Sequence, residues 1–378
     1  MPERVLETIA EPRLRPVRKS DAAEPASKYA ELAVALEQHR GERLLILLSG
    51  YPDPDSIASG LALQHLARLH GIESRLLSFH EVSHQENQAL VTKLELDLWL
   101  YDARCDLEPY QLYAFVDAPR TETPIQDQLA KKTFLAFVDH HKRLADVPAA
   151  FVDVREEAGS TAAIFAEYLR AAQPEGLDAD DAEQGKLATA LMHGIRADTR
   201  GLLEGEPIDF LGAAYLAPAV DQPLLRTISA QSLSPAVMDM IQAALERRKV
   251  FDNFLVSDVG VVRKEHRDGI PQAADFLLMR AGIDTVLVFG IVDGKTIEGS
   301  LRTRGDTLNP DAFLKKAFGA DDERGAPYGG GNVRNKGGFQ IPLGFLGQHK
   351  DRDQLYHLAG EIVLEKFLAA IGHQNDER

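Results

Sequence analysis

The chain has 378 residues, 44% of them apolar and 26% charged, which is ordinary for a globular protein and long enough for two domains. The formal net charge of −16 argues against a protein that coats long duplex nucleic acid by neutralising phosphates. The single cysteine, Cys105, excludes an intramolecular disulfide framework and indicates a reducing cytoplasm. No apolar run reaches the roughly 18 residues that span a bilayer, so we expect no membrane partner.

The first domain is predicted from alternating helices and strands over residues 28–205. Before it, residues 1–27 mix proline, glutamate and arginine, which predicts a mobile tail or a partner-binding arm rather than a secretory signal. The strands are continuous apolar runs, which are typical of an α/β fold whose parallel sheet has helices on both faces. We expect strands at 44–48, 74–79, 112–117, 133–138 and 149–154, and helices at 28–39, 57–69, 87–94, 160–171 and 181–193.

The second half of the chain has a different pattern. Residues 206–251 are predicted to be a helical linker, because 210–218 and 235–250 look helical and no strand lies between them. After residue 252 the pattern is rich in strands, and the Asp293-Gly294 pair is a strong hairpin signal. We predict a smaller mixed α/β domain over 252–378, with strands at 254–264, 285–292 and 296–304 and helices at 272–280, 310–318 and 354–371.

Polar residues follow predicted strands of the first domain, or the end of a predicted helix in the case of Asp198, at the edge where open α/β sheets bind ligands. They are Asp53 and Asp55, Asp117, Asp139-His140-His141, and Asp198. Carboxylates and imidazoles gathered there would form a site for a hard cation, with mainly oxygen ligands and some nitrogen ligands. This ligand set favours Mn²⁺ and also allows Mg²⁺, Co²⁺ or Zn²⁺.

Each of these residues also has an ordinary structural interpretation. Asp53 and Asp55 alternate with prolines, which fits a solvated turn. Asp117 and Asp198 could cap helices, and the two histidines could be surface or core residues. Their joint occurrence at one edge of one sheet favours a shared metal site over these separate explanations.

This residue set resembles the DHH phosphoesterase superfamily, which includes RecJ-type exonucleases, nanoRNase/pAp phosphatases and family II pyrophosphatases. The family pattern is H-x-x-x-D-x-D, a lone Asp, D-H-H and a later Asp. The later half of the chain is similar to the DHH-associated domain, and its short two-domain layout resembles nanoRNase/pAp phosphatases most. The matching residues are Asp53, Asp55, Asp117, Asp139-His140-His141 and Asp198, and then Ser300-Leu301-Arg302-Thr303 and Gly329-Gly330-Gly331-Asn332.

The resemblance implies a catalytic centre with two metal ions, expected to be Mn²⁺. Asp117 would bridge the ions, Asp55, His140 and Asp198 would complete one site, and Asp53 would serve the other. His141 would face the substrate phosphate, so the catalytic group would be Asp117, His140 and His141.

The second domain would bind the rest of the substrate. An arginine suits bidentate phosphate recognition, although a salt bridge at the rim is the alternative. Consecutive glycines let a backbone approach a phosphate, although a flexible turn is the alternative. The substrate-binding group would be His141, Arg302, Gly329, Gly330, Gly331, Asn332 and Lys336, with Arg334 adding positive charge.

Two residues depart from the family pattern. Ser49 stands where the family has the histidine of its first motif, and Asn332 stands where it has the histidine of the Gly-rich loop. A hydroxyl is a poorer ligand for a transition metal than an imidazole. One metal site is therefore expected to be weak, filled only with substrate, or empty.

The expected activity is hydrolysis of short oligonucleotides, linear dinucleotides or nucleotides similar to 3′-phosphoadenosine-5′-phosphate (pAp). The alternative is a nucleotide-binding or regulatory protein that keeps the fold but has lost catalysis through Ser49 and Asn332. The retained aspartates and histidines favour the enzyme, because a pure binder does not need so negative a site. The last helix is expected to pack on its own domain through Leu355, Leu358, Ile362, Phe367 and Ile371. A homodimer is also possible.

Overall fold

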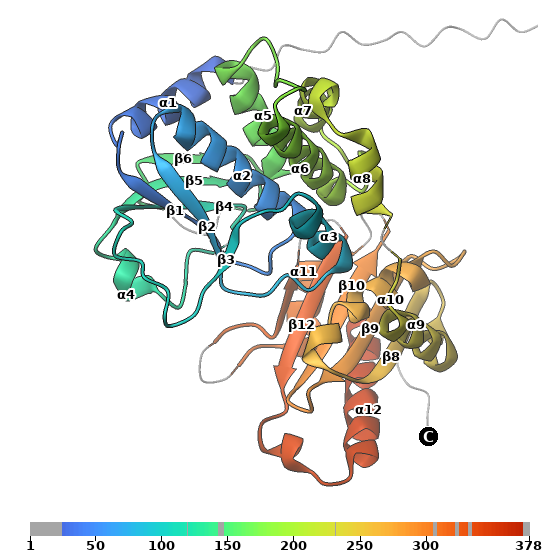
Figure 1. Ribbon diagram of the computed structural model, residues 1–378. Coiled ribbons are helices and arrows are strands. Elements are labelled where there is room, and N and C mark those ends of the chain that lie inside the picture. The colour runs from blue at the N-terminus through green and yellow to red at the C-terminus, as the bar shows by residue number, and fades with distance from the viewer. Residues whose placement is uncertain are drawn as a thin grey trace, which may run out of the picture. The chain divides into compact units, whose positions relative to one another are not determined.

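The computed structural model describes residues 25–118, 120–142, 147–230, 232–304, 308–321, 325–331 and 335–372. Most of the predicted tail, residues 1–24, lies outside this part. The chain divides into two compact units (Figure 1), of which the first is Met1–Glu81 with Leu90–Arg226. The second is Val82–Ala89 with Thr227–Arg378. The predicted domain boundaries at residues 205 and 251 stay predictions.

The first unit contains a six-stranded sheet in which every neighbouring pair of strands runs parallel, as the apolar runs predicted. The strand order is β3-β2-β1-β4-β5-β6. Only β3 was not predicted, because three residues are too few for a periodic signal. The strands are β1 Arg43–Leu48, β2 Glu73–Ser78, β3 Leu98–Leu100, β4 Leu112–Val116, β5 Thr133–Asp139 and β6 Phe151–Val154.

Helices cover both faces of this sheet (Figure 1). On one face α1 and α2 pack against the strands, α5 packs against both helices, and α6 and α7 form a further layer. On the other face the short helix α4 and its neighbouring loops cover a cluster that includes Phe115 and Phe137. The helices are α1 Pro25–Glu37, α2 Pro54–Leu69, α3 Gln85–Lys93, α4 Gln126–Leu129, α5 Thr161–Ala172, α6 Ala182–Asp198, α7 Pro207–Leu216 and α8 Gln222–Ser229.

The strand order creates a switch point between β1 and β4. The chain moves outward from β1 through β2 to β3, and then returns to the opposite side of β1 as β4. Loops that leave the carboxyl ends of such strands diverge and form the crevice in which open α/β sheets bind ligands. The predicted metal residues Asp53, Asp55, Asp117 and His140 follow β1, β4 and β5, and Asp198 is the last residue of α6. The topology of the sheet therefore gathers those that follow the strands at this crevice.

The second unit is a mixed six-stranded sheet with strand order β11-β12-β10-β9-β8-β7. Only the β8–β9 pair is parallel. Helices α9 and α10 cover one face, and α11 and α12 cover the other. The elements are α9 Pro235–Arg247, β7 Lys249–Phe251, β8 Phe254–Val262, α10 Gly269–Leu278, β9 Thr285–Val292, β10 Thr296–Thr303, α11 Pro310–Phe318, β11 Gly329–Gly331, β12 Lys336–Pro342 and α12 Arg352–Ile371.

The predicted hairpin at Asp293-Gly294 is confirmed. Both residues have positive φ, 50° and 66°, as a tight two-residue turn requires. Two other predictions for this half of the chain are wrong. The helix expected to end at residue 250 stops at Arg247, because the chain turns into β7, and the glycines at 329–331 form an edge strand rather than a loop. Within the predicted helical linker, residues 222–229 form a helix, α8, that was not predicted separately.

The last helix faces its core with a different set of residues from the one predicted. Leu355 and Phe367 are buried, but Leu358 and Ile362 are each 47% exposed. Ala359 and Val363 take their place in the core, which gives a buried stripe with a spacing of four residues.

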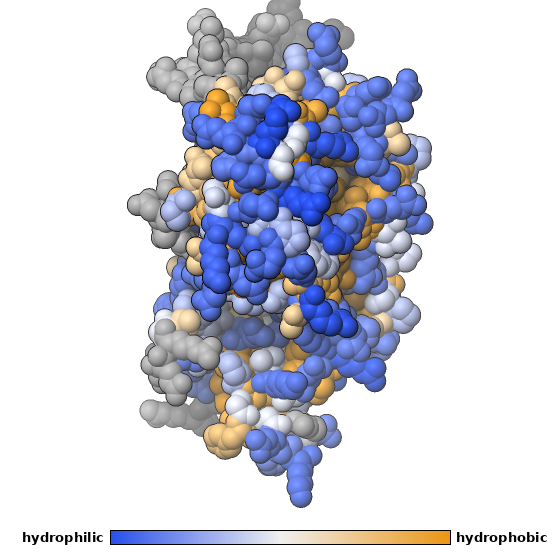
Figure 2. All heavy atoms as spheres, turned by 60° about the vertical axis from the view of Figure 1, so that its left-hand side comes forward, coloured by the Kyte–Doolittle hydropathy of each residue, from blue (hydrophilic) through white to orange (hydrophobic). Residues whose placement is uncertain are grey.

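No helix in the described part of the chain is long and apolar enough to cross a membrane. The face drawn in Figure 2 is covered mainly by hydrophilic side chains, with hydrophobic ones in smaller patches. This fits the acidic composition of the chain.

Candidate metal centre

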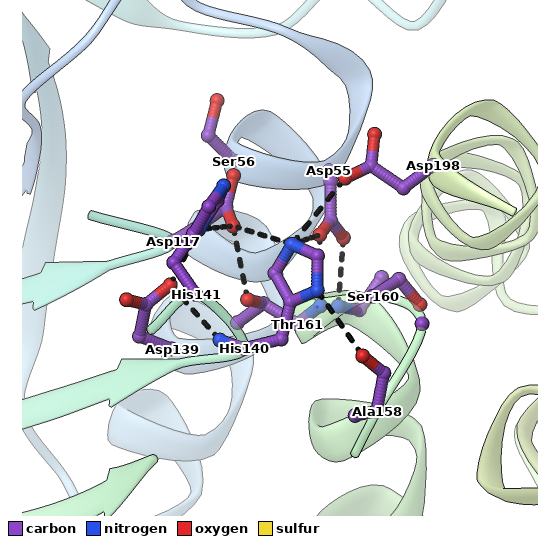
Figure 3. Close-up of polar contacts among 12 residues, drawn as sticks. Asp55, Ser56, Asp117, Asp139, His140, His141, Ala158, Ser160, Thr161 and Asp198 are labelled. Carbon is purple, nitrogen blue, oxygen red and sulfur yellow. Dashed lines mark hydrogen bonds and ion pairs between the residues drawn. The ribbon is translucent and has the colours of Figure 1, made fainter. Parts of the chain in front are cut away.

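The loops at the carboxyl edge of the first sheet bring the predicted aspartates and histidines together (Figure 3). Two sets of three side chains could each hold an ion, because the ligand atoms within each set lie within 4.8 Å of one another. His140 belongs to both sets. The sets are Asp117, His140 and His141, and Asp55, His140 and Asp198.

Asp53 and Asp55 stand where β1 passes into α2. Asp53 is the N-cap of α2, and its Oδ1 accepts a hydrogen bond of 2.8 Å from the Ser56 backbone N–H. Pro54 occupies the first helical position, where its missing N–H costs nothing. Asp55 follows in the first turn with no exposed surface. Asp53 therefore has a structural role and belongs to neither set of three.

The N-terminus of α5 holds the carboxylate of Asp55. The backbone N–H groups of Thr161 and Ala162 donate to its two oxygens at 2.8 and 2.7 Å. The Thr161 hydroxyl donates to Asp117 Oδ1 at 3.0 Å. Thr161 was not among the site residues predicted from the sequence, although Ser160-Thr161 before an apolar helix is an N-cap signal. That signal marks the start of a helix but not the carboxylates it will meet.

Asp117 has an unusual backbone conformation directly after β4. Its φ is +49°, in the left-handed region that costs a residue with a Cβ atom about 1–3 kcal/mol. Its N–H donates to the Val138 carbonyl at 2.9 Å, which anchors the turn. The conformation brings Asp117 Oδ1 to 3.6 Å from His140 Nε2 and 3.5 Å from His141 Nδ1.

The ring of His140 lies between three carboxylates (Figure 3). Its Nδ1 faces the Ala158 carbonyl at 3.3 Å, which assigns the ring proton to that nitrogen. Its Nε2 is buried, has no hydrogen-bond partner, and lies 3.4–3.9 Å from the nearest carboxylate oxygens of Asp198, Asp117 and Asp55. An imidazole nitrogen this close to three carboxylates requires positive charge, which either a proton on the ring or a divalent metal supplies. The combination of oxygen and nitrogen donors fits a divalent metal.

Asp139 orients both histidines. Its Oδ1 accepts from the His140 backbone N–H at 2.9 Å and lies 2.9 Å from His141 Nδ1. Asp139 is 2% exposed, whereas the side chain of His141 is 38% exposed. With Nδ1 directed at Asp139, His141 presents its other nitrogen outward.

Comparison with known proteins identifies similar folds. No known protein-family profile matches the chain. An uncharacterised protein of Methanocaldococcus jannaschii is 35% identical over 344 residues, which are 90% of this chain and 67% of that protein. Among solved structures, an exopolyphosphatase-related protein from Bacteroides fragilis matches with a TM-score of 0.67 at 14% identity, over 90% of this chain and 98% of its own. The chain therefore has the fold of this exopolyphosphatase-related protein. RecJ from Thermus thermophilus, solved with Mn²⁺, matches with a TM-score of 0.50 at 16% identity, over 91% of this chain and 54% of its own.

Burial and neighbouring charges shift the pKa values of this cluster of aspartates and histidines. Burial, reinforced by neighbouring carboxylates, raises the pKa of Asp117 to about 7 and the pKa of Asp55 well above its usual value. Burial and the charge of Asp198 also raise the pKa of Asp53, so Asp53 faces the same region. Burial opposes protonation of His140, but the adjacent carboxylates of Asp198, Asp117 and Asp55 raise its pKa well above normal.

The predicted substrate-binding residues lie in the second unit, apart from His141. Arg302 on β10 stands opposite Lys336 on β12. The Arg302 Nε donates to Asp275 at 2.7 Å. Arg302 therefore forms a salt bridge, which was the alternative to phosphate binding. Gly329, Gly330 and Gly331 pair with β12, and the Gly331 N–H donates to Asp311 Oδ1 at 3.3 Å. Asn332 and Arg334 lie outside the described residues.

Proposed function

We propose that this chain belongs to the DHH phosphoesterase superfamily and is a metal-dependent phosphoesterase that hydrolyses short oligonucleotides, linear dinucleotides or pAp-like nucleotides. The observation that carries the proposal is the buried Nε2 of His140, which faces Asp55, Asp117 and Asp198 without a hydrogen-bond partner. A divalent cation would be coordinated by this nitrogen and would offset the carboxylate charges together, whereas a proton on His140 offsets only one of them.

Two divalent ions, when bound, would lower the pKa of a shared water and stabilise the attacking and leaving oxygens of the phosphoester. We propose Asp55, His140 and Asp198 as the ligands of one ion, Asp53 as a ligand of the other, and Asp117 as the ligand common to both. Ser49 stands just beyond β1, where the superfamily has a histidine, so the ion near Asp53 should bind more weakly.

His141 is proposed to contact the substrate phosphate. Its side chain is 38% exposed, and the bond of Nδ1 to Asp139 fixes the ring. Arg302 and Lys336 place two positive charges on neighbouring strands and are proposed to bind the remaining phosphate charge, together with Gly329, Gly330, Gly331 and Asn332.

Mn²⁺ is the proposed ion. The ligands combine carboxylate oxygens with imidazole nitrogen, and Mn²⁺ accepts both more readily than Mg²⁺ does. RecJ, which shares the fold, was solved with Mn²⁺. Mg²⁺ or Co²⁺ would be expected to substitute in part.

The test is a hydrolysis screen of the full chain with Mn²⁺ over linear dinucleotides, longer oligomers, pAp and cyclic dinucleotides. We expect turnover of the short linear substrates, no turnover by His140→Ala, and unchanged turnover by His357→Ala, an exposed histidine of α12. Nucleotide binding without hydrolysis of any substrate would favour the alternative of a catalytically impaired regulatory protein.

A further inference from the structure

One short segment, residues 158–161, contacts most of the metal centre. The Ala158 carbonyl lies 3.3 Å from His140 Nδ1 and thereby sets which nitrogen of that ring faces the carboxylates. Thr161 donates to both Asp117 and Asp55. Because this segment orients three of the proposed ligands, whatever holds it in place also determines the geometry of the centre.

Asp209 holds this segment. It comes from α7, far along the chain, and has no exposed surface. Its Oδ2 accepts from the Gly159 N–H at 3.0 Å, and its Oδ1 accepts from the Ser160 hydroxyl at 2.8 Å. Oδ2 also accepts from the Glu206 N–H at 2.8 Å, within the first turn of its own helix. Two of these three bonds therefore go to the segment and only one to α7.

Two glycines allow Asp209 and the segment 158–161 to come this close together. At Gly212, one turn beyond Asp209, a Cβ would stand 3.1 Å from the Ala166 Cβ, so α7 packs closely along α5. At Gly159 a Cβ would stand 2.3 Å from Asp209 Oδ2 and 2.8 Å from the Thr199 Cγ2, which no real side chain tolerates. Only a glycine lets the backbone of the segment reach the carboxylate of Asp209.

We propose that Asp209 is a positioning residue of the metal centre, which sets the affinity for divalent ions through the segment 158–161 without touching an ion. This role rests on the proposed function. Groups that orient metal ligands from outside typically change metal affinity or activity by roughly 10–100-fold when they are removed. A helix-capping role alone would instead change only the stability of the fold.

The test compares Mn²⁺ binding by calorimetric titration with thermal unfolding of the metal-free full chain. Asp209→Ala should weaken Mn²⁺ binding by roughly 10–100-fold. Asp209→Asn should keep most of the affinity, because its amide oxygen still accepts from both backbone N–H groups and its amide nitrogen can donate to Ser160. Tyr215→Phe is the matched control, since it removes bonds from α7 to the Leu169 and Gln173 carbonyls but none to the segment. It should lower the unfolding temperature and leave Mn²⁺ affinity unchanged.

A second variant covers the case in which Asp209→Ala does not fold. Gly159→Ala keeps every hydrogen-bonding group but pushes the segment away from Asp209, so it should also weaken Mn²⁺ binding. Wild-type affinity in the folded Asp209→Ala or Gly159→Ala protein would overturn the positioning role and leave the proposed function intact. A wild-type protein that binds no Mn²⁺ would overturn both.

Discussion

At the scale of single residues, the candidate metal centre combines buried carboxylates that repel one another with histidines that can offset part of their charge. Asp117 has a left-handed backbone conformation and a pKa raised to about 7. His140 has a buried Nε2 without a hydrogen-bond partner. The sequence predicted the identity of these residues, because aspartates and histidines after apolar runs are visible as a pattern. It could not predict the φ of Asp117 or the tautomer of His140, since both depend on contacts with Val138 and Ala158.

The charges of the centre predict how the stability of the metal-free protein depends on pH. The raised pKa of Asp117 means that the folded state binds its proton more tightly than the unfolded state, whose pKa is about 3.9. This stabilisation is lost as pH rises from about 4 to about 7. His140 acts in the same direction, because its stabilisation is complete below about 6.5 and is lost above that value.

We therefore expect the unfolding temperature of the chelator-treated protein to fall between about pH 5 and about pH 8, and added Mn²⁺ to raise it more at the higher pH. Scanning calorimetry with and without Mn²⁺ measures both effects. An equal Mn²⁺ effect at both pH values would contradict the assignment of these groups to an ion site.

Replacing Asp117 separates function from stability. Asp117→Asn should weaken Mn²⁺ binding by more than about 100-fold, which exceeds the usual effect of a neighbouring group. The same variant should unfold at no lower temperature than wild type near pH 8 without metal, because it removes a repelled buried charge and keeps an acceptor for Thr161. Asp127→Asn, at an exposed position on α4, is the control. A large loss of metal-free stability with normal Mn²⁺ affinity would refute the ligand role.

At the scale of elements, the long helices and strands were predictable from their periodic patterns. Which of their ends lie close together in the fold was not predictable. The apolar runs identified β1, β4 and β5, and Ser160 marked the start of α5. The elements β3 and α8 were not predicted, because they are too short to show a periodic pattern of apolar residues. The N-terminus of α5 points at Asp55 and Asp117 because of packing between segments more than 40 residues apart. A local sequence pattern cannot predict such packing.

Thr161 tests the contribution of this helix end. Thr161→Val keeps the shape of the side chain and the backbone bond to Asp55, but removes the hydroxyl bond to Asp117. We expect kcat/KM to fall roughly 10-fold or more through a misplaced ligand, and the free energy of unfolding to fall by only about 1 kcal/mol. Steady-state kinetics and denaturant unfolding measure the two quantities. Unchanged kcat/KM in a destabilised protein would show that the bond serves the fold alone.

At the scale of the whole molecule, the sequence predicted two α/β bodies but not how the chain is shared between them. Residues 82–89 follow β2 in the sequence yet group with the second unit, where the Ser83 hydroxyl donates to Asp268. Such an assignment depends on long-range contacts of polar residues, and polar loop residues carry no signal of their partner. The substrate roles of the second unit therefore remain proposals.

Arg302 is the residue of the second unit whose role is most open to test. Arg302→Ala should raise KM about 10–100-fold, as expected for a charged hydrogen bond of about 1.5–3 kcal/mol, and should lower kcat less. Asp275→Ala is the control, because it removes the salt-bridge partner and leaves the guanidinium in place. Equal kinetic losses in the two variants would assign Arg302 to the salt bridge rather than to phosphate binding.

The most direct measurement titrates chelator-treated full-length protein with Mn²⁺ while following bound ions and hydrolysis of a linear dinucleotide together. The proposed function predicts no turnover without metal, one ion bound more tightly than a second, and turnover that appears as the second site fills. Metal-independent turnover, or two filled sites without turnover of the dinucleotide or of pAp, would contradict a metal-dependent phosphoesterase with this centre.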